Sequence, residues 1–306
     1  SLQFGFKQKC STSLCTMVLK ETVAYYMSNN TPVFSCYLDA TKAFDKVNYC
    51  KLFDILLKRG LPVHIIRILV NFYVGHIVRV SWQGISSDYF AALNGVKQGG
   101  VISPVLFCVY YDVLLGRLND STVGCYIGQF FVGALAYADD IVLLAPSASA
   151  MRKLLLICNS YASSFDMSFN PSKSKCIVFV PERCQTARHF LRKTVFYING
   201  LPIENVTQWL HLGHVITENL DDTSEVKAKC KTFIGQANNM LSYFGKLPSY
   251  VKSRLFQIYC TSLYGCVLWP IDQYILKDFC VAWRKALRRT WNLPQSSHGF
   301  LLPLLS

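Results

Sequence analysis

The sequence has few charged residues and no repeats or low-complexity segments. Only 16% of its 306 residues are charged, whereas 52% are apolar. This composition excludes a disordered chain and favours one large domain, or two to three subdomains with linked cores. No uncharged apolar run is long enough to cross a bilayer, because the longest one, from Val101, ends at Asp112. We therefore expect no membrane partner.

Paired cysteine motifs are also missing. The 13 Cys are scattered without a CxxC pair, and no signal peptide precedes them. Free thiols in a reducing, intracellular compartment are favoured over disulfides. The chain opens at Ser1 inside an already patterned segment, so we expect a fragment or an excised domain of a longer protein. A mean hydropathy of +0.26 indicates surface that such missing sequence covers.

Acidic residues are scarce relative to basic ones. The chain has 31 Lys and Arg against 18 Asp and Glu, which gives a net charge of +13. Residues 223–306 alone hold 11 basic and 3 acidic residues. This balance favours a polyanion such as nucleic acid as the partner, with a solvated surface as the plainer alternative.

Apolar periodicity predicts an α+β domain followed by a helical one. Its elements are helices over residues 10–30, 39–59, 62–74, 104–118 and 148–167, and strands over 33–38, 176–180 and 195–198. Two hairpins are expected, one over residues 77–93 and one over 131–145. After about residue 223 the pattern becomes helical and basic.

Three aspartates end apolar strands. Asp39 follows the strand over residues 33–38, and Asp139 and Asp140 lie at the tip of the second hairpin. A carboxylate there is costly unless it is solvated, paired or bound to a metal. Two divalent ions bridged by carboxylates clamp the attacking and leaving oxygens of a phosphoryl transfer, and oxygen ligands suit Mg²⁺. An Asp-Asp turn alone is weak support, because Asp is common in turns.

The segment Tyr137-Ala138-Asp139-Asp140 between two apolar strands resembles the signature of reverse transcriptases. Further segments resemble that family in the same order. They are Phe34–Val47 (first catalytic strand), Asn94–Pro104 (template and nucleotide loop), Asn170–Lys175 (lysine motif) and Leu212-Gly213 (primer grip). Phe4-Gly5-Phe6, Tyr264–Trp269 and Trp283–Arg289 resemble polymerases of non-long-terminal-repeat (LINE-type) retrotransposons. The family's upstream fingers motifs, with basic residues for the triphosphate, are missing, as is its endonuclease.

The resemblance implies an α+β right-hand polymerase palm with a split βαβ, antiparallel sheet. Partial fingers and palm would occupy residues 1–222, and a basic helical thumb 223–306. The implied activity is RNA-directed DNA synthesis by two-metal nucleotidyl transfer from a dNTP to a primer 3′-hydroxyl. The implied partners are two Mg²⁺ (or Mn²⁺) ions, an RNA template, a DNA primer and dNTPs, in the cytoplasm and nucleus. The alternatives are a decayed or domesticated element that binds nucleic acid without polymerising, and an RNA-templated RNA polymerase.

The family pattern also implies residue roles. Asp39, Asp139 and Asp140 hold metal, and Phe44 excludes a 2′-hydroxyl by steric clash, which argues against the RNA polymerase. Lys173 protonates or neutralises the leaving pyrophosphate, with Lys175 as a rival. The remaining assignments are Ala40, Gln98, Gly99 and Tyr137 for dNTP and template; Leu212 and Gly213 for the primer; and Lys227, Lys229, Lys231, Arg284, Lys285, Arg288 and Arg289 for the nucleic-acid backbone. The plainer alternatives are a core Phe, an ordinary turn and solvated surface charges.

Overall fold

The computed structural model describes residues 2–270 and 273–298, and it divides the chain into two compact units. The first unit extends to Leu212 and the second begins at Gly213. The sequence placed this boundary later, after residue 222, where the helical pattern starts. The division falls earlier because β14 (His214–Thr217) packs with the helices that follow it.

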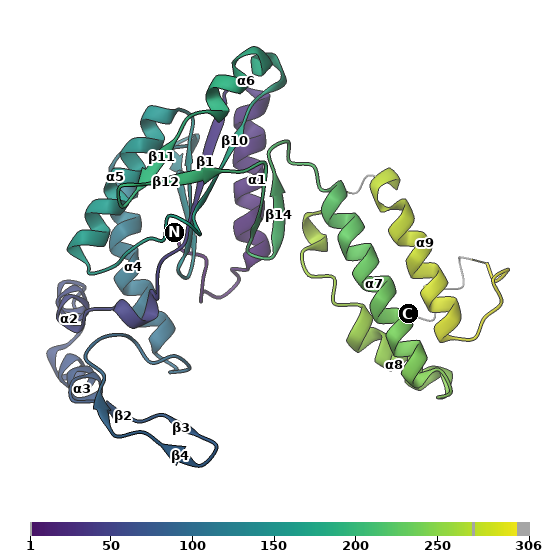
Figure 1. Cartoon of the computed structure of the whole chain (residues 1–306), viewed down its shortest axis with the longest axis horizontal. Helices are drawn as coiled ribbons and strands as arrows, with labels where there is room; N and C mark the ends of the chain where they lie inside the picture. Colours follow the sequence, from purple (N-terminus) through teal and green to yellow (C-terminus); the bar gives the residue numbers. More distant parts are fainter. Residues whose placement is uncertain (1, 271–272, 299–306) are drawn as a thin grey trace. The chain divides into compact units, whose positions relative to one another are not determined.

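The first unit is built on a six-stranded sheet with the order β11-β12-β10-β1-β9-β8 (Figure 1). β1 (Val33–Leu38) lies inside the sheet, and all six of its residues are buried. It pairs antiparallel with β9 (Asp140–Ala145) and β10 (Lys175–Phe179). β8 (Ala134–Tyr137) pairs with β9, whereas β12 (Leu201–Asn205) runs parallel to β10 and antiparallel to β11 (Phe196–Ile198).

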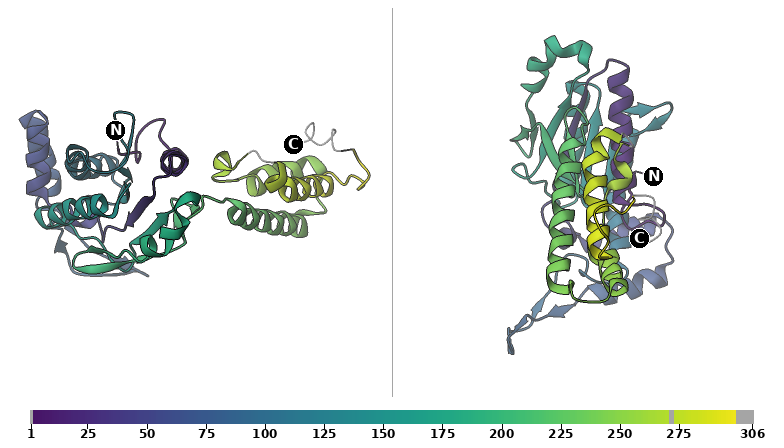
Figure 2. Two further views of the ribbon diagram at one scale, coloured as in Figure 1. Left: turned by 90° about the horizontal axis from the view of Figure 1, so that it is seen from above. Right: turned by 90° about the vertical axis from the view of Figure 1, so that its right-hand side faces the viewer.

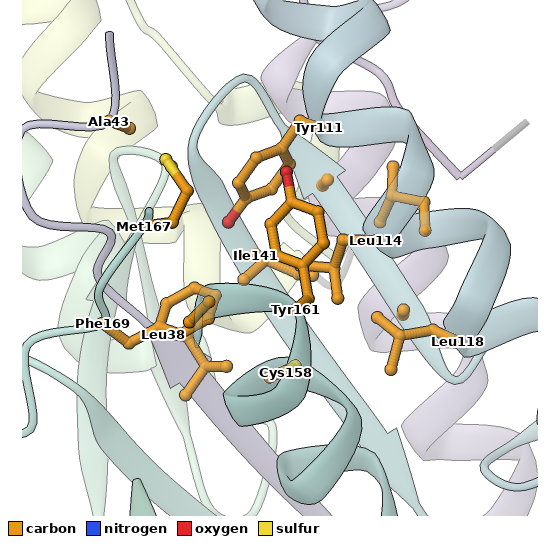
Figure 3. Packing of buried hydrophobic residues seen from close by; sticks show 14 of the residues in the cluster. Leu38, Ala43, Tyr111, Leu114, Leu118, Ile141, Cys158, Tyr161, Met167 and Phe169 are labelled. Carbon is orange, nitrogen blue, oxygen red and sulfur yellow. The ribbon is translucent and has the colours of Figure 1, made fainter. Parts of the chain in front are cut away.

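Helices cover both faces of this sheet, because alternate residues of a strand point to opposite sides. α1 (Thr12–Ser28) covers one face, and α4 (Ser103–Asp120) and α5 (Ala148–Ser164) cover the other (Figure 2). Leu38 and Ile141 pack with aromatic side chains such as Tyr161 on the second side (Figure 3). Burial of each large apolar side chain contributes about 1.5–3 kcal/mol. The first unit is therefore the α+β sheet domain that the sequence predicts.

A smaller helical region and a projecting hairpin follow β1. α2 (Tyr49–Lys58) and α3 (Val63–Tyr73) lead into a β-ribbon of paired short strands (Figure 1). β2 (Ile77–Val78) pairs with β5 (Phe90–Ala91), and β3 (Ser81–Trp82) pairs with β4 (Ile85–Ser86). The ribbon turns at Gln83 and Gly84, which both have positive φ, as tight hairpin turns require.

One predicted element is wrong in its extent. The helix expected from Asp39 to Arg59 is broken, and only a 3-10 turn, η1 (Phe44–Lys46), precedes α2. Lys42 has a φ of 47°, which ends any helical run. The Asn48 side chain then accepts a hydrogen bond from Lys51 N (3.2 Å) and caps the new helix. Phe44 is therefore on a turn rather than a helix.

Several short elements had no clear signal in the sequence. In the first unit they are β6 (Tyr126–Ile127), β7 (Phe130–Phe131), η2 (Glu182–Cys184), α6 (Gln185–Arg192), β12 and β13 (Gln208–His211). Apart from α6, these elements have two to five residues, which is too few to display a period.

The second unit is helical after β14, as predicted. It contains α7 (Thr223–Phe244), α8 (Ser249–Cys260), η3 (Cys266–Leu268) and α9 (Gln273–Thr290). Its core is aromatic: Phe233 stacks on Trp283 with ring centroids 5.3 Å apart, and Phe256 meets the same indole edge-on. Across the described residues of both units, no helix is long and apolar enough to span a membrane.

Candidate active site

The three aspartates lie at one end of the sheet. Leu38, the last residue of β1, is paired with Ile141, so Asp39 emerges beside the start of β9. Asp139 lies in the two-residue turn between β8 and β9, and Asp140 begins β9 opposite Tyr137. The antiparallel register therefore brings together residues that are 100 positions apart in the sequence.

The carboxyl groups interact electrostatically. Partial burial raises the pKa of Asp140 to about 6, and repulsion from Asp139 and Asp39 adds to the rise. Burial also raises the pKa of Asp139; a hydrogen bond from its own backbone amide lowers this pKa, and the charge of Asp39 raises it by less. Asp140 as a whole is exposed, so the crowded turn desolvates its carboxyl group only in part. Asp39 thus disfavours the ionisation of both Asp139 and Asp140, and Asp139 disfavours that of Asp140.

A divalent cation suits this set of donors. Carboxylate oxygens are the ligands that Mg²⁺ prefers, and a cation would relieve the repulsion that raises the two pKa values. Within residues 2–270 and 273–298, however, no group of three or more Asp, Glu, His or Cys side chains lies in an arrangement that could hold a metal ion as it stands. The three aspartates thus fit a metal by charge and chemistry, and the metal assignment stays a prediction.

The loop with the predicted lysine motif is anchored to the backbone of Asp39. Asn170 N donates to Asp39 O (2.8 Å), and Asp39 N donates to the hydroxyl of Ser174 (3.2 Å). Asn170 Oδ1 also accepts from Ser172 N (3.0 Å), which shapes the loop as an Asx turn. This pair of backbone contacts fixes Lys173 near the carboxylates.

The two lysines of this loop differ in their partners. Lys175 Nζ donates to Glu204 Oε2 and to Ser172 O, each at 2.7 Å, and only 15% of its side chain is exposed. Both lysines line a cavity of about 350 Å³ together with Asp39 and Asp140, and Lys173 is exposed. Lys175 is held by structural contacts, which leaves Lys173 as the better candidate for chemistry.

The Phe44 side chain is half-buried and packs against two other aromatic rings. Its ring stacks on Phe107 of α4 with centroids 4.2 Å apart, and Phe6 meets it edge-on at 6.5 Å. Val96 N donates to Phe44 O (2.9 Å), so the Asn94–Gly100 loop is tied to the same turn. These contacts restrict the movement of the Phe44 ring.

The remaining residues that are predicted to bind nucleotide lie on the loop tied to Phe44 or next to the aspartates. Gln98 is exposed, and its Nε2 makes a long contact with Asp45 Oδ1 (3.4 Å). Gly99 has a φ of 81°, which favours glycine there although no atom would crowd a side chain. Ala40 pairs with Phe169, and Tyr137 pairs with Asp140, so both are held by backbone contacts.

The two predicted primer-grip residues fall in different units. Leu212, with a φ of 48°, lines the cavity that contains Asp39, together with Trp209 and His211. Gly213 belongs to the second unit, where an added methyl would lie 2.7 Å from the Tyr264 ring. The close approach to Tyr264 explains the glycine, and the role of both residues stays a prediction.

The predicted basic cluster of the second unit is not uniform. Arg284, Lys285 and Arg289 are exposed on α9, although Arg284 also donates to Cys280 O and Arg289 to Asn238 Oδ1. Arg288 is half-buried and donates from Nη2 to Ser297 O (2.9 Å), so it is used within the unit. On α7, Lys227 and Lys231 are exposed one turn apart, whereas Lys229 approaches the Tyr264 ring (5.9 Å).

A family model described as reverse transcriptase (RNA-dependent DNA polymerase) matches residues 1–231. The chain belongs to the reverse transcriptase family. Its predicted family is thereby confirmed. It is 30% identical, over 230 residues, to the Retrovirus-related Pol polyprotein from type-2 retrotransposable element R2DM of Drosophila melanogaster. It is 23% identical, over 296 residues, to the RNA-directed DNA polymerase from mobile element jockey of Drosophila funebris.

This reverse transcriptase chain spans only part of its relatives. The first match covers 73% of the chain and 21% of the relative, and the second covers 94% and 30%. Among solved structures, apo telomerase from Candida tropicalis, truncated from its C-terminal domain, superposes with a TM-score of 0.50 at 12% identity. That match covers 72% of the chain and 40% of the telomerase. Together with the family match, this likeness confirms the predicted α+β right-hand polymerase fold class.

Sequence reasoning missed two contacts at this site. Ser174 holds the backbone of Asp39, and Gln3 holds the backbone of Ala138 beside Asp139. Ser174 stands within the lysine motif, so the motif contained a signal. Gln3 is 135 residues from Ala138, and only the fold brings them together.

Proposed function

We propose that the chain is an RNA-directed DNA polymerase of a non-long-terminal-repeat retrotransposon. It joins a deoxynucleotide to a primer 3′-hydroxyl and releases pyrophosphate. The observation that supports this most is the strand register that brings Asp39, Asp139 and Asp140 to the same end of the sheet. The family implies a divalent metal, and the all-oxygen donors favour Mg²⁺, with Mn²⁺ as a substitute.

The aspartates would hold two metal ions. Such ions activate the attacking hydroxyl and neutralise the leaving group of a phosphoryl transfer. The chain's own contribution is to fix three carboxylates at the end of a rigid sheet, where partial desolvation strengthens their electrostatic interactions. Placement on paired strands limits the movement of the reacting atoms.

Phe44 selects deoxynucleotides over ribonucleotides. Its ring is fixed between Phe107 and Phe6, so it does not yield to a 2′-hydroxyl on the incoming sugar. The Gln98 amide, on the loop tied to Phe44, offers a donor and an acceptor for nucleotide or template. Lys173, exposed beside the carboxylates, supplies a proton or a positive charge to the departing pyrophosphate.

The exposed basic residues of the second unit hold the template–primer duplex. Arg284, Lys285 and Arg289 on α9, with Lys227 and Lys231 on α7, contact phosphates without reading sequence. The description of the family supports RNA as the template. DNA as the primer and an intracellular location in the cytoplasm and nucleus are further parts of this proposal.

The test is primer extension by the purified chain with Mg²⁺ or Mn²⁺. A DNA primer is annealed to an RNA or a DNA template and supplied with deoxy- or ribonucleotides. The proposal predicts extension on the RNA template with deoxynucleotides. Duplex binding without extension under any combination would favour the non-polymerising element, and extension with ribonucleotides alone would favour an RNA polymerase.

A further inference from the structure

The opening segment of the chain lies along the edge of the catalytic sheet. Phe4 N donates to Ala136 O (2.8 Å), and Ala136 N donates to Leu2 O (2.9 Å). Gln3 forms a parallel bridge with Ala136 of β8. This edge pairing places the Gln3 side chain beside the turn that follows β8.

The Gln3 amide binds the backbone of Ala138 at both ends. Its Oε1 accepts from Ala138 N (2.9 Å) and from Gly5 N (2.8 Å), and its Nε2 donates to Ala138 O (3.1 Å). The residue is only 2% exposed. A single buried side chain therefore satisfies the N–H and the C=O of the residue that precedes Asp139.

The turn needs external support. Ala138 has a φ of 57°, in the left-handed region that favours glycine. A residue other than glycine keeps such a conformation when its surroundings hold it there. Gly5 packs so closely that an added methyl would collide with Ala138 N. On α4, the buried Tyr111 makes a longer contact from its hydroxyl to Asp139 O (3.4 Å).

We propose that Gln3 is a positioning residue, which holds the Ala138–Asp139 turn so that the carboxylates keep the geometry needed for metal. The inference rests on the proposed polymerase function. Gln3 reaches no nucleotide itself and acts through the peptide of Ala138. The same segment supports Phe44 through Phe6. Residues 3–6 thus support both the Ala138–Asp139 turn and Phe44, the residue proposed to select the sugar of the nucleotide.

The experiment compares Gln3→Met with Gln8→Met. The first keeps the volume of the side chain and removes its hydrogen bonds, and the second changes an exposed glutamine of the same segment. Three quantities are measured in each variant: amide hydrogen exchange at Ala138, single-nucleotide insertion as kcat and KM, and the Mg²⁺ concentration for half-maximal rate. Gln3→Glu, which keeps the acceptor for Ala138 N, tests partial rescue of the exchange protection.

In Gln3→Met, Ala138 should exchange about tenfold faster or more. Its kcat should fall about 10- to 100-fold and the Mg²⁺ requirement should rise, while KM for the nucleotide stays near wild type. Gln8→Met should match wild type. Unchanged exchange at Ala138, or faster exchange with unchanged kcat and Mg²⁺ requirement, would overturn the positioning role. A wild-type chain that never extends a primer would instead refute the proposed function, and the positioning role with it.

Discussion

The pH dependence of stability offers a sharp test of the carboxylate cluster. Asp140 has a pKa of about 6 in the folded chain, above its ordinary value of 3.8. A raised carboxyl pKa means that the folded state binds the proton more tightly than the unfolded state. The resulting stabilisation is complete below pH 3.8 and is lost as the pH rises through 6. The first unit should therefore be less stable at about pH 7.5 than at about pH 5.

The size of the effect follows from the shift. About two pKa units correspond to about 3 kcal/mol over the whole titration, and about half of this is lost between pH 5 and pH 7.5; the solvent exposure of Asp140 reduces that half to about 0.5–1 kcal/mol. For a unit of this size, each kcal/mol changes the melting temperature by about 2–4 °C. Mg²⁺ binds the ionised carboxylates, so it should restore the loss at about pH 7.5 and have little effect at about pH 5.

The assay is thermal unfolding at both pH values, with and without Mg²⁺. Asp140→Asn should flatten the pH dependence and weaken the response to Mg²⁺. Asp166→Asn is the matched control, because Asp166 bonds to Lys51 (2.6 Å) and its pKa is lowered, so its contribution has the opposite sign. A wild-type pH profile and Mg²⁺ response in Asp140→Asn would refute the reasoning.

Three further results are expected. Phe44→Val should admit ribonucleotides while most deoxynucleotide use persists, because the smaller side chain opens space at the sugar; an unchanged incorporation ratio would contradict this. Neutralising Arg284, Lys285 and Arg289 together should weaken binding to nucleic acid of any sequence and reduce the magnitude of the slope of log K against log salt by about 2–3. An unchanged slope would mean that these residues are ordinary solvated surface charges. Lys173→Ala should lower kcat by about 10²–10³ with little change in KM, whereas a wild-type rate would exclude it from the chemistry.

The strands that carry the aspartates were predictable because their apolar runs are short and uninterrupted. β1 matches its predicted bounds, and β9 ends at residue 145, where the second predicted hairpin ends. Their ends meet because antiparallel pairing aligns Leu38 with Ile141. Strand ends with acidic residues therefore located the candidate site without knowledge of the fold.

Other features depend on tertiary contacts that leave no local pattern. The break before α2 comes from the backbone at Lys42 and the cap at Asn48, within a stretch whose apolar spacing suits a helix. Arg288 has the same composition signal as Arg289, yet Arg288 is half-buried and bonds to Ser297 O, whereas Arg289 is exposed and bonds to Asn238 Oδ1. The contact between Gln3 and Ala138 joins residues that are 135 positions apart, and local periodicity has no information about such pairs.

The most direct test of the central claim is single-nucleotide insertion on an RNA template by the wild-type chain and by Asp139→Asn. The substitution keeps the size of the side chain and removes a charge that the proposal assigns to metal binding. We predict extension by the wild type and a loss of about 10³-fold or more in the variant, with an equal or higher melting temperature. Insertion by Asp139→Asn within tenfold of the wild-type rate would contradict the account.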